Sequence, residues 1–474
     1  MVKELCVIAS PRLCLLCLLC LLCLTACDAA DDRPPPGLPC TPNVQAGIDP
    51  NADVSFDPAR PLCVKLQMAA PRFEALRVEN RFGVPNDVVI DELFARFTDS
   101  CIDAFPSRFN WYETDVEIDG VGLQRVGVRK KGFLGSVMGQ GLFKPSLKLK
   151  TDHIKAAQLL GQTERVTLNN NNQDPTRMRT CLAYALFTAA DYPAPRCNLA
   201  TVMLNGESLG AYTHVEAVKK RFLKRAFGDS SGALYEGTLA DFTIEHSAGF
   251  QAGKLGRWEA KTGDTDRHGA PLQKLVDALQ VPDSQLLTAL QPVLNLDRFV
   301  RFWALEVIIH HTDGFTSMRN NFFVYFDPTD SHRAVFVPWG TDNVFNDDGG
   351  AVDLRLFAFS SLPRRLSRLP AVAALLQAEI TRLLRDVWDP DAILAQVERF
   401  AAQVHQAQDD PSYDAEITTL RAWVTKRRAR LEASLAAGMP TGAAAEAGCM
   451  ALPGGGLPGA QGGLTLLTAL ALAW

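Results

Sequence analysis

The sequence predicts an α+β protein with two lobes, in which a β-rich N-terminal part precedes a helical C-terminal part. Short β-prone runs separated by turns that contain Gly and Asn gather in residues 116–215. Apolar residues at helical spacing then fill residues 363–437. With 47% apolar and 21% charged residues, a chain of 474 residues can bury a large core. The net charge of −5 gives no reason to expect a nucleic-acid partner.

The first 26 residues have the features of a targeting segment. Lys3 and Arg12 flank the apolar run 13–24, which is too short to span a bilayer as a helix. The run ends in Leu24-Thr25-Ala26-Cys27, which resembles a bacterial lipobox. This resemblance implies cleavage before Cys27 and a lipid anchor on its thiol, so we expect an exported protein attached to a membrane of the bacterial cell envelope. The alternative is an ordinary signal peptide that is rich in cysteine.

Composition divides the rest of the chain into three parts. Residues 27–60 are rich in Pro, Asp and Gly, which predicts a tether between the membrane and the folded domain. Residues 61–440 are expected to hold that domain. Residues 441–474 form an Ala- and Gly-rich tail that we expect to be disordered.

Cysteine usage agrees with export. Six cysteines follow Cys27, and an even number in an oxidising compartment favours disulfides. Cys181 with Cys197 is the preferred pair, because a helix that carries the first and a strand that opens at the second become neighbours after the turn at residues 193–195. The sequence does not choose among the other pairings. No two of the cysteines after Cys27 have the Cys-x-x-Cys spacing of a structural zinc site, so the sequence does not predict one.

The folded part is expected to start near Leu62. The β-prone runs 116–118 and 123–129 flank Asp119-Gly120, which is a hairpin signal. Residues 146–150 alternate polar and apolar side chains as a half-buried strand does.

A Gly-rich stretch, residues 130–141, lies between these strands. A kinase-like small lobe covers a triphosphate with a Gly-rich loop that lies between two strands, and the strands carry lysines. Lys148 is the candidate for the phosphate contact, with Lys144 and Lys150 as alternatives. The other interpretation is a Gly-rich hairpin with a purely structural role.

A strand and a helix are predicted next. Residues 166–169 have the composition of a strand, and Asp174 followed by Pro175 is a strong start signal for a helix that ends at Ala190.

A second hairpin, formed by residues 199–204 and 211–215, ends at Glu216. An acid in this place would pair with the phosphate-contacting lysine, as in kinases generally. The alternative is an acid that stabilises the N-terminus of the next helix. The polar residues 228–290 predict an insertion between the lobes, in which Lys261 is a reserve candidate for phosphate contact.

The candidate site lies in residues 304–345. An apolar helix over residues 297–311 leads to Asp313, Asn320 and Asn321 open a strand, and a second strand delivers Asp342. Hard oxygen ligands of this kind suit Mg²⁺ or Mn²⁺ together with the phosphate oxygens of ATP. In phosphoryl transfer, Asp313 would accept the proton of the attacking hydroxyl, and the Asn pair and Asp342 would hold the metal.

The ordered set of motifs resembles the spore-coat protein H (CotH) family of atypical, secreted protein kinases. The resemblance covers residues 115–345 in blocks, and these are Val128–Gly132, Lys144–Lys150, Asn205–Glu216, Asp313, Asn320–Phe323 and Trp339–Asp342. It implies a two-lobed, protein-kinase-like fold that transfers phosphate from ATP to Ser or Thr of an unidentified protein substrate. Lys148 and Glu216 would then contact the cofactor.

One residue departs from the family pattern. The commoner turn has Asp at the position of Gly340, so the metal site here depends on Asp342, with Asp347 and Asp348 close behind. This departure leaves two alternatives open. One is a surface-binding or adhesion protein that keeps the fold without turnover, and the other is a metal-dependent hydrolase that uses the same acids without a nucleotide.

Overall fold

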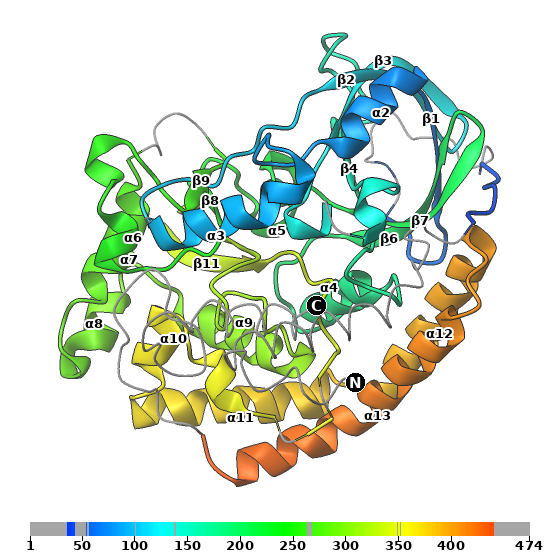
Figure 1. Cartoon of the computed structure of the whole chain (residues 1–474). Helices are drawn as coiled ribbons and strands as arrows, with labels where there is room; N and C mark the ends of the chain where they lie inside the picture. The colour runs from blue at the N-terminus through cyan, green and yellow to red at the C-terminus, as the bar shows by residue number, and fades with distance from the viewer. Residues whose placement is uncertain are drawn as a thin grey trace, which may run out of the picture.

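The computed structural model describes residues 36–42, 54, 56–99, 101–136, 139–262, 268–347, 349–350 and 352–439. It is a mixed α/β structure with a sheet-rich N-terminal part and a helical C-terminal part (Figure 1). The predicted targeting segment, Cys27 and the tail 441–474 lie outside the described residues. Within the described ranges, no helix is both long and apolar enough to cross a bilayer.

The N-terminal strands form a closed barrel, which the sequence did not predict. The predicted strands are confirmed, and β1 lies parallel to β6 and closes the sheet. Alternating apolar side chains such as Val64, Val126 and Leu149 fill the interior. In barrel order the strands are β1 (Leu62–Gln67), β2 (Tyr112–Ile118), β3 (Val121–Lys130), β4 (Leu147–Lys150), β5 (Arg165–Asn169), β7 (Glu207–Val215) and β6 (Cys197–Leu204).

Short helices fill the connections of the barrel. Phe133 of the Gly-rich loop packs edge-on against Phe82 and Phe105, which belong to the segment between β1 and β2. The elements of these connections are α2 (Ala70–Val78), η1 (Asn86–Val88), α3 (Val89–Asp99), η2 (Leu134–Ser136) and η3 (Gly139–Leu142).

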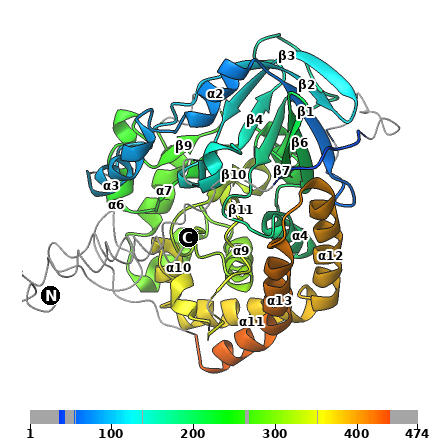
Figure 2. The same ribbon diagram turned by 45° about the vertical axis from the view of Figure 1, so that its right-hand side comes forward.

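A second sheet has the order β11-β10-β8-β9 and lies between the barrel and the helices (Figure 2). Its strands are β8 (Leu234–Gly237), β9 (Trp258–Ala260), β10 (Phe322–Asp327) and β11 (Arg333–Pro338). The β10–β11 hairpin is confirmed, but the prediction of an insertion at residues 228–290 is wrong. β8 is an inner strand because its buried residues pair with β10 on one side and β9 on the other.

The helices at the edges of this sheet are short, except for the one that supports it. α9 (Leu296–Ile309) is the predicted buried helix, and it packs against β11 and α11. The others are α5 (Lys220–Phe227), α6 (Ile244–Ser247), η4 (Phe250–Ala252), α7 (Ala270–Ala278), η6 (Asp283–Gln285) and α8 (Leu286–Leu290).

The C-terminal part is helical, as predicted, but its first helix is divided. α10 ends at Leu366 and Pro370 opens α11, because proline suits the first turn of a helix and not its interior. The elements are η8 (Leu354–Phe357), α10 (Ser361–Leu366), α11 (Pro370–Asp386), α12 (Pro390–Ala407) and α13 (Tyr413–Ala436).

The start predicted for the helix after β5 is wrong by four residues. α4 spans Arg179–Ala189, because Arg177 has a left-handed backbone (φ 60°) that a continuous helix does not allow. Asp174 caps the turn instead. Its carboxylate accepts hydrogen bonds from the backbone N–H of Thr176 at 3.0 Å and of Arg179 at 2.8 Å.

Two disulfides between described residues tie elements together. The predicted Cys181–Cys197 bond joins α4 to β6, and Cys40–Cys63 joins the stretch before the domain to β1. The N–H of Leu38 also donates to the carbonyl of Ala407 at 2.8 Å. The described residues 36–42 of the predicted tether are therefore fastened to the domain.

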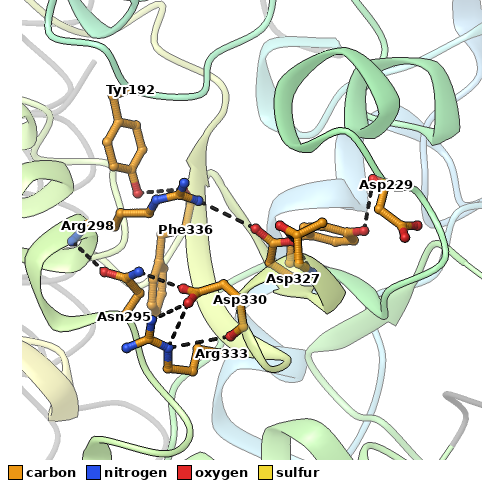
Figure 3. A network of polar contacts seen from close by, with 10 residues as sticks. Tyr192, Asp229, Asn295, Arg298, Asp327, Asp330, Arg333 and Phe336 are labelled. Atoms are coloured by element: carbon orange, nitrogen blue, oxygen red, sulfur yellow. Dashed lines mark hydrogen bonds and ion pairs between the residues drawn. The ribbon is translucent and has the colours of Figure 1, made fainter.

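The turn of the β10–β11 hairpin is held by a polar network (Figure 3). Asn295, the N-cap of α9, donates to Asp330 at 2.6 Å, and Asp330 accepts from Arg333 at 3.1 Å. Arg298 lies 3.6 Å from the buried Asp327. These contacts fix one end of the hairpin to the start of α9, so the opposite end of the hairpin meets the end of α9.

Candidate active site

A buried glutamate fixes the loop that carries the first candidate acid. Glu306 on α9 is fully buried, and its two carboxylate oxygens accept the N–H of Phe315 at 3.0 Å and the N–H of Thr316 at 2.8 Å. His311 Nδ1 lies 3.3 Å from the same carboxylate. A Cβ at Gly314 would lie 2.2 Å from Glu306 Oε1, so only glycine fits there. The loop after α9 is thereby clamped to the helix that precedes it.

Asp313 and the Asn pair come together, as the sequence predicted. Asn320 Nδ2 donates to one carboxylate oxygen of Asp313 at 3.0 Å, and Asn321 Nδ2 donates to the other at 2.6 Å. All three side chains are half-buried. Because each amide uses its nitrogen on the carboxylate, its carbonyl oxygen is the atom that it can offer to a ligand.

Gly340 shapes the turn that leads to Asp342. The N–H of Trp339 donates to the carbonyl of Asn321 at 3.2 Å, which holds the turn against the Asn pair. Gly340 has a left-handed backbone (φ 55°), and a Cβ there would lie 2.3 Å from Asn321 Oδ1. An aspartate at this position would therefore both strain the backbone and displace Asn321. Glycine is the residue that lets Asn321 approach the turn.

Asp342 lies within the electrostatic field of Asp313. Burial and then the charge of Asp313 raise the pKa of Asp342 to about 6, and the field of Lys131 opposes this shift. Burial also raises the pKa of Asp313, although its two amide hydrogen bonds oppose the shift. Two carboxylates that repel each other in this way form a place where a cation would be stabilised.

Basic side chains line the outer face of the barrel. Lys148 on β4 pairs with Arg129 on β3, and directly opposite residues of an antiparallel pair point to the same side. Leu147 and Leu149 point inward, so Lys148 faces away from the barrel core. Burial lowers the pKa of Lys148 to about 7, and Glu236 opposes this shift.

Lys131 links this basic face to the acids. Its Nζ donates to Asn169 Oδ1, and its backbone N–H donates to the carbonyl of Ser146 at 2.9 Å. Burial lowers its pKa to about 8, while the charges of Asp342 and Glu236 oppose the shift. Lys131 was not among the predicted phosphate contacts, although its charge acts on Asp342.

Glu236, and not Glu216, is the acid beside the lysines. Glu236 forms an ion pair with Lys261, the reserve candidate, and its pKa is lowered because Lys261 and Lys148 outweigh its burial. Glu216 instead pairs with Arg196 at 2.8 Å and Arg225 at 2.6 Å. The predicted pairing of Glu216 with the phosphate-contacting lysine is therefore wrong, because Arg196 and Arg225 bind its two carboxylate oxygens.

The two alternative lysines have other partners. Lys144 is buried and its Nζ donates to the carbonyl of Ala211 at 2.6 Å, so it braces the barrel. Lys150 lies 3.5 Å from Asp152. Asp347, a proposed substitute ligand, pairs with Arg427 at 3.2 Å and Arg430 at 2.7 Å. Asp348 lies outside the described residues.

One of the residues that were missed had a signal in the sequence. Glu306 is the single acid in the run Leu305–Ile309, and a charged residue inside an apolar helix has to find a buried partner. Glu236 gave no such signal, because only the pairing of β8 with β10, opposite Phe323, places it beside the site.

The donor chemistry fits a magnesium-type ion bound together with a phosphate ligand. No group of three or more His, Cys, Asp or Glu side chains in the described part of the chain could hold a metal ion. Asp313 and Asp342 supply two carboxylates, and the Asn pair supplies amide oxygens. Mg²⁺ in phosphate sites uses one or two carboxylates and takes its other ligands from phosphates and water.

Comparison with known proteins gives the family. The model of the CotH kinase protein family matches residues 135–431, which is more than half of the chain. The chain belongs to the CotH kinase protein family. The match includes Lys148, Asp313, the Asn pair and Asp342, and it begins after β3 and the strands that precede it.

Curated relatives share only part of this CotH chain. It is 25% identical to the inner spore coat protein H of Bacillus subtilis over 238 residues, which are 46% of this chain and 62% of that protein. It is 22% identical to the invasin CotH3 of Rhizopus delemar over 227 residues, which are 46% of this chain and 37% of that protein. The invasin CotH2 of the same fungus is 20% identical over 228 residues, 46% of this chain and 38% of that protein.

Proposed function

We propose that this CotH protein is a kinase that transfers phosphate from ATP to Ser or Thr residues of a protein, with Mg²⁺ or Mn²⁺. The observation that carries the proposal is that a group of acids and a group of lysines act on each other electrostatically. Asp313, which the Asn pair holds, and Asp342 form the first group, and Lys131 and Lys148 form the second. The charges of Asp342 and Lys131 attract each other. In a complex of a metal ion with a triphosphate, the positive metal would bind to the acids and the negative phosphates would bind to the lysines. This electrostatic pairing of acids with lysines also supports a two-lobed, kinase-like arrangement.

Each side chain has a defined task in this proposal. Asp313 would accept the proton of the attacking hydroxyl at a carboxylate oxygen, and burial makes that oxygen more basic than usual. Asn320 and Asn321 orient this carboxylate and offer amide oxygens to the metal, as does Asp342 with its carboxylate. Lys148 would contact the phosphates. A metal bound there would neutralise negative charge on the phosphates.

Calorimetry tests the proposal. We expect ATP to bind in the presence of Mg²⁺ or Mn²⁺, with Kd in the micromolar range, and we expect the Asp342→Ala and Lys148→Ala variants to bind at least about tenfold more weakly, as for a lost charge-assisted contact. Glu117→Ala is a matched control, because this acid lies on β2 and pairs with Lys65. Absence of binding to the unaltered protein with both metals would refute the kinase.

A surface-binding protein without turnover is the second candidate. Gly340 favours it, since the commoner family turn has an acid at this position. Two of the relatives are named invasins, and these names also favour a surface-binding protein. Incubation with labelled ATP, metal and a mixture of envelope proteins separates the candidates, because only the kinase leaves label on protein Ser or Thr.

We also propose that the protein is anchored to a bacterial membrane through a lipid on Cys27, at the end of the lipobox-like sequence. Detergent-phase partitioning of the cell fraction tests this. The unaltered protein should enter the detergent phase and Cys27→Ser should stay in the aqueous phase. Equal partitioning of the two would refute the anchor.

A further inference from the structure

Arginines gather behind the loop that carries Asp313. The chain after β8, residues 238–241, is held by neighbours on either side. Thr238 N–H donates to the carbonyl of Arg257 at 3.1 Å, and Ala240 N–H donates to the carbonyl of Arg319 at 2.8 Å. These bonds bring the backbones of two arginines from distant parts of the sequence to one short segment.

The same segment also binds the start of α10. Asp241 accepts the N–H of Ser361 at 3.0 Å and its hydroxyl at 2.5 Å, and it accepts the N–H of Phe242 at 2.8 Å. Arg364 lies one turn further along α10. Its charge and that of Arg319 repel each other across Asp241, which attracts both. Asp241 thus accepts hydrogen bonds from Ser361 and Phe242 and also attracts Arg319 and Arg364 electrostatically.

A buried histidine completes this group. His246 on α6 has an exposed fraction of 2%, and neither of its ring nitrogens has a hydrogen-bond partner. Arg364 Nε is likewise buried without a partner. Asp241, Arg319 and Arg257 all act on His246 electrostatically, which places it in the same group. Buried polar nitrogens normally have partners, so these atoms indicate a missing acceptor.

The backbone beside this group is strained. Arg319 (φ 59°) and Asn321 (φ 51°) both have left-handed backbones, and they flank Asn320, which orients Asp313. Non-glycine residues in this conformation persist where the surroundings hold them, and they cluster at functional sites. A ligand on the Arg319 side chain would therefore act directly on the loop of the candidate active site.

We propose that His246, Arg257, Arg319 and Arg364 form a binding site for a phosphate group, and that its occupancy orders the loop from Asp313 to Asn321. A tetrahedral dianion supplies acceptors for a neutral imidazole N–H and for guanidinium forks. Binding of the anion is independent of the kinase activity, whereas its regulatory meaning rests on the proposed function. Arg364 is half-buried and provides the side from which the anion enters.

Histidine-labelled NMR with inorganic phosphate tests the binding. The Cε1–H signal of His246, assigned with His246→Gln, should shift in a saturable way. Arg364→Gln should weaken the affinity by about tenfold or more, as for a lost charge-assisted bond, and Arg364→Lys should retain part of it. Arg355→Gln, which removes an exposed arginine paired with Asp353, should bind as the unaltered protein does. No saturable shift, or equal affinity in Arg364→Gln, would overturn the site.

Hydrogen exchange tests the effect on the loop. Lys148→Met removes the phosphate contact proposed for the active site, so that added phosphate acts mainly at the second site. In this variant, phosphate should slow amide exchange in residues 313–321, and the additional Arg364→Gln change should abolish the slowing. Exchange that phosphate leaves unchanged would refute the ordering. Neither experiment contains ATP, so failure of the kinase proposal would be seen separately.

Discussion

Replacing Asp342 with Asn should stabilise the metal-free protein at neutral pH. The pKa of Asp342 is raised from 3.8 to about 6 by burial and by Asp313. An acid whose folded pKa is raised binds more protons in the folded state, so its ionisation destabilises the fold as pH rises from about 4 to 6. The shift corresponds to about 3 kcal/mol at pH 7 and about 0.5 kcal/mol near pH 4. Because Asp342 is half-buried, solvent screening reduces the value at pH 7 to about 1–3 kcal/mol.

Urea unfolding of the Asp342→Asn variant and the unaltered protein, in EDTA at pH 4, 5, 6 and 7, measures this difference. We expect the variant to be more stable at pH 7 and the difference to shrink steadily toward pH 4. Excess Mg²⁺ with ATP should reverse the order, because only the unaltered protein gains stability from the ligand. A variant that is less stable at pH 7 in EDTA, or a difference that does not change with pH, would refute the reasoning. Glu117→Gln on β2 is a matched control, with no change above about 0.5 kcal/mol expected.

Three further changes follow from the same contacts. Glu306→Gln should cost about 2–3 kcal/mol in the free energy of unfolding, because an amide NH2 donor replaces one of the two buried carboxylate oxygens that accept three hydrogen bonds; a cost below about 0.5 kcal/mol in urea unfolding would contradict this clamp. Gly340→Asp should cost about 1–3 kcal/mol and weaken ATP binding, because it displaces Asn321 from the turn; improved binding in calorimetry would count against this geometry. Replacing both Cys181 and Cys197 with Ser should lower stability by about 3 kcal/mol, the value for a closed loop of this length, and a thermal midpoint equal to that of the unaltered protein would speak against it.

The candidate site was largely predictable because its residues are close in sequence. Asp313 and the Asn pair fall within nine consecutive residues, between the end of α9 and the start of β10. Local signals also gave the hairpins, α9 and the Cys181–Cys197 bond. The predictions failed where a contact between distant parts of the chain decided the conformation or the partner of a residue. Arg177 interrupts the helix expected to begin after Asp174, and Arg196 and Arg225 take the acid expected beside the phosphate lysine.

The sequence by itself determined the hairpins β2–β3, β6–β7 and β10–β11, the helix α9, and the loop that brings Asp313 to the Asn pair. Periodicity, capping and turn residues act over a few residues, so they are visible in the chain. Only the tertiary structure decided the closure of the barrel, the choice of Glu236 beside Lys148, and the placing of His246 within the electrostatic reach of Asp241, Arg257 and Arg319. These contacts join segments that are far apart in the sequence, and strand register and packing select them where local pattern does not.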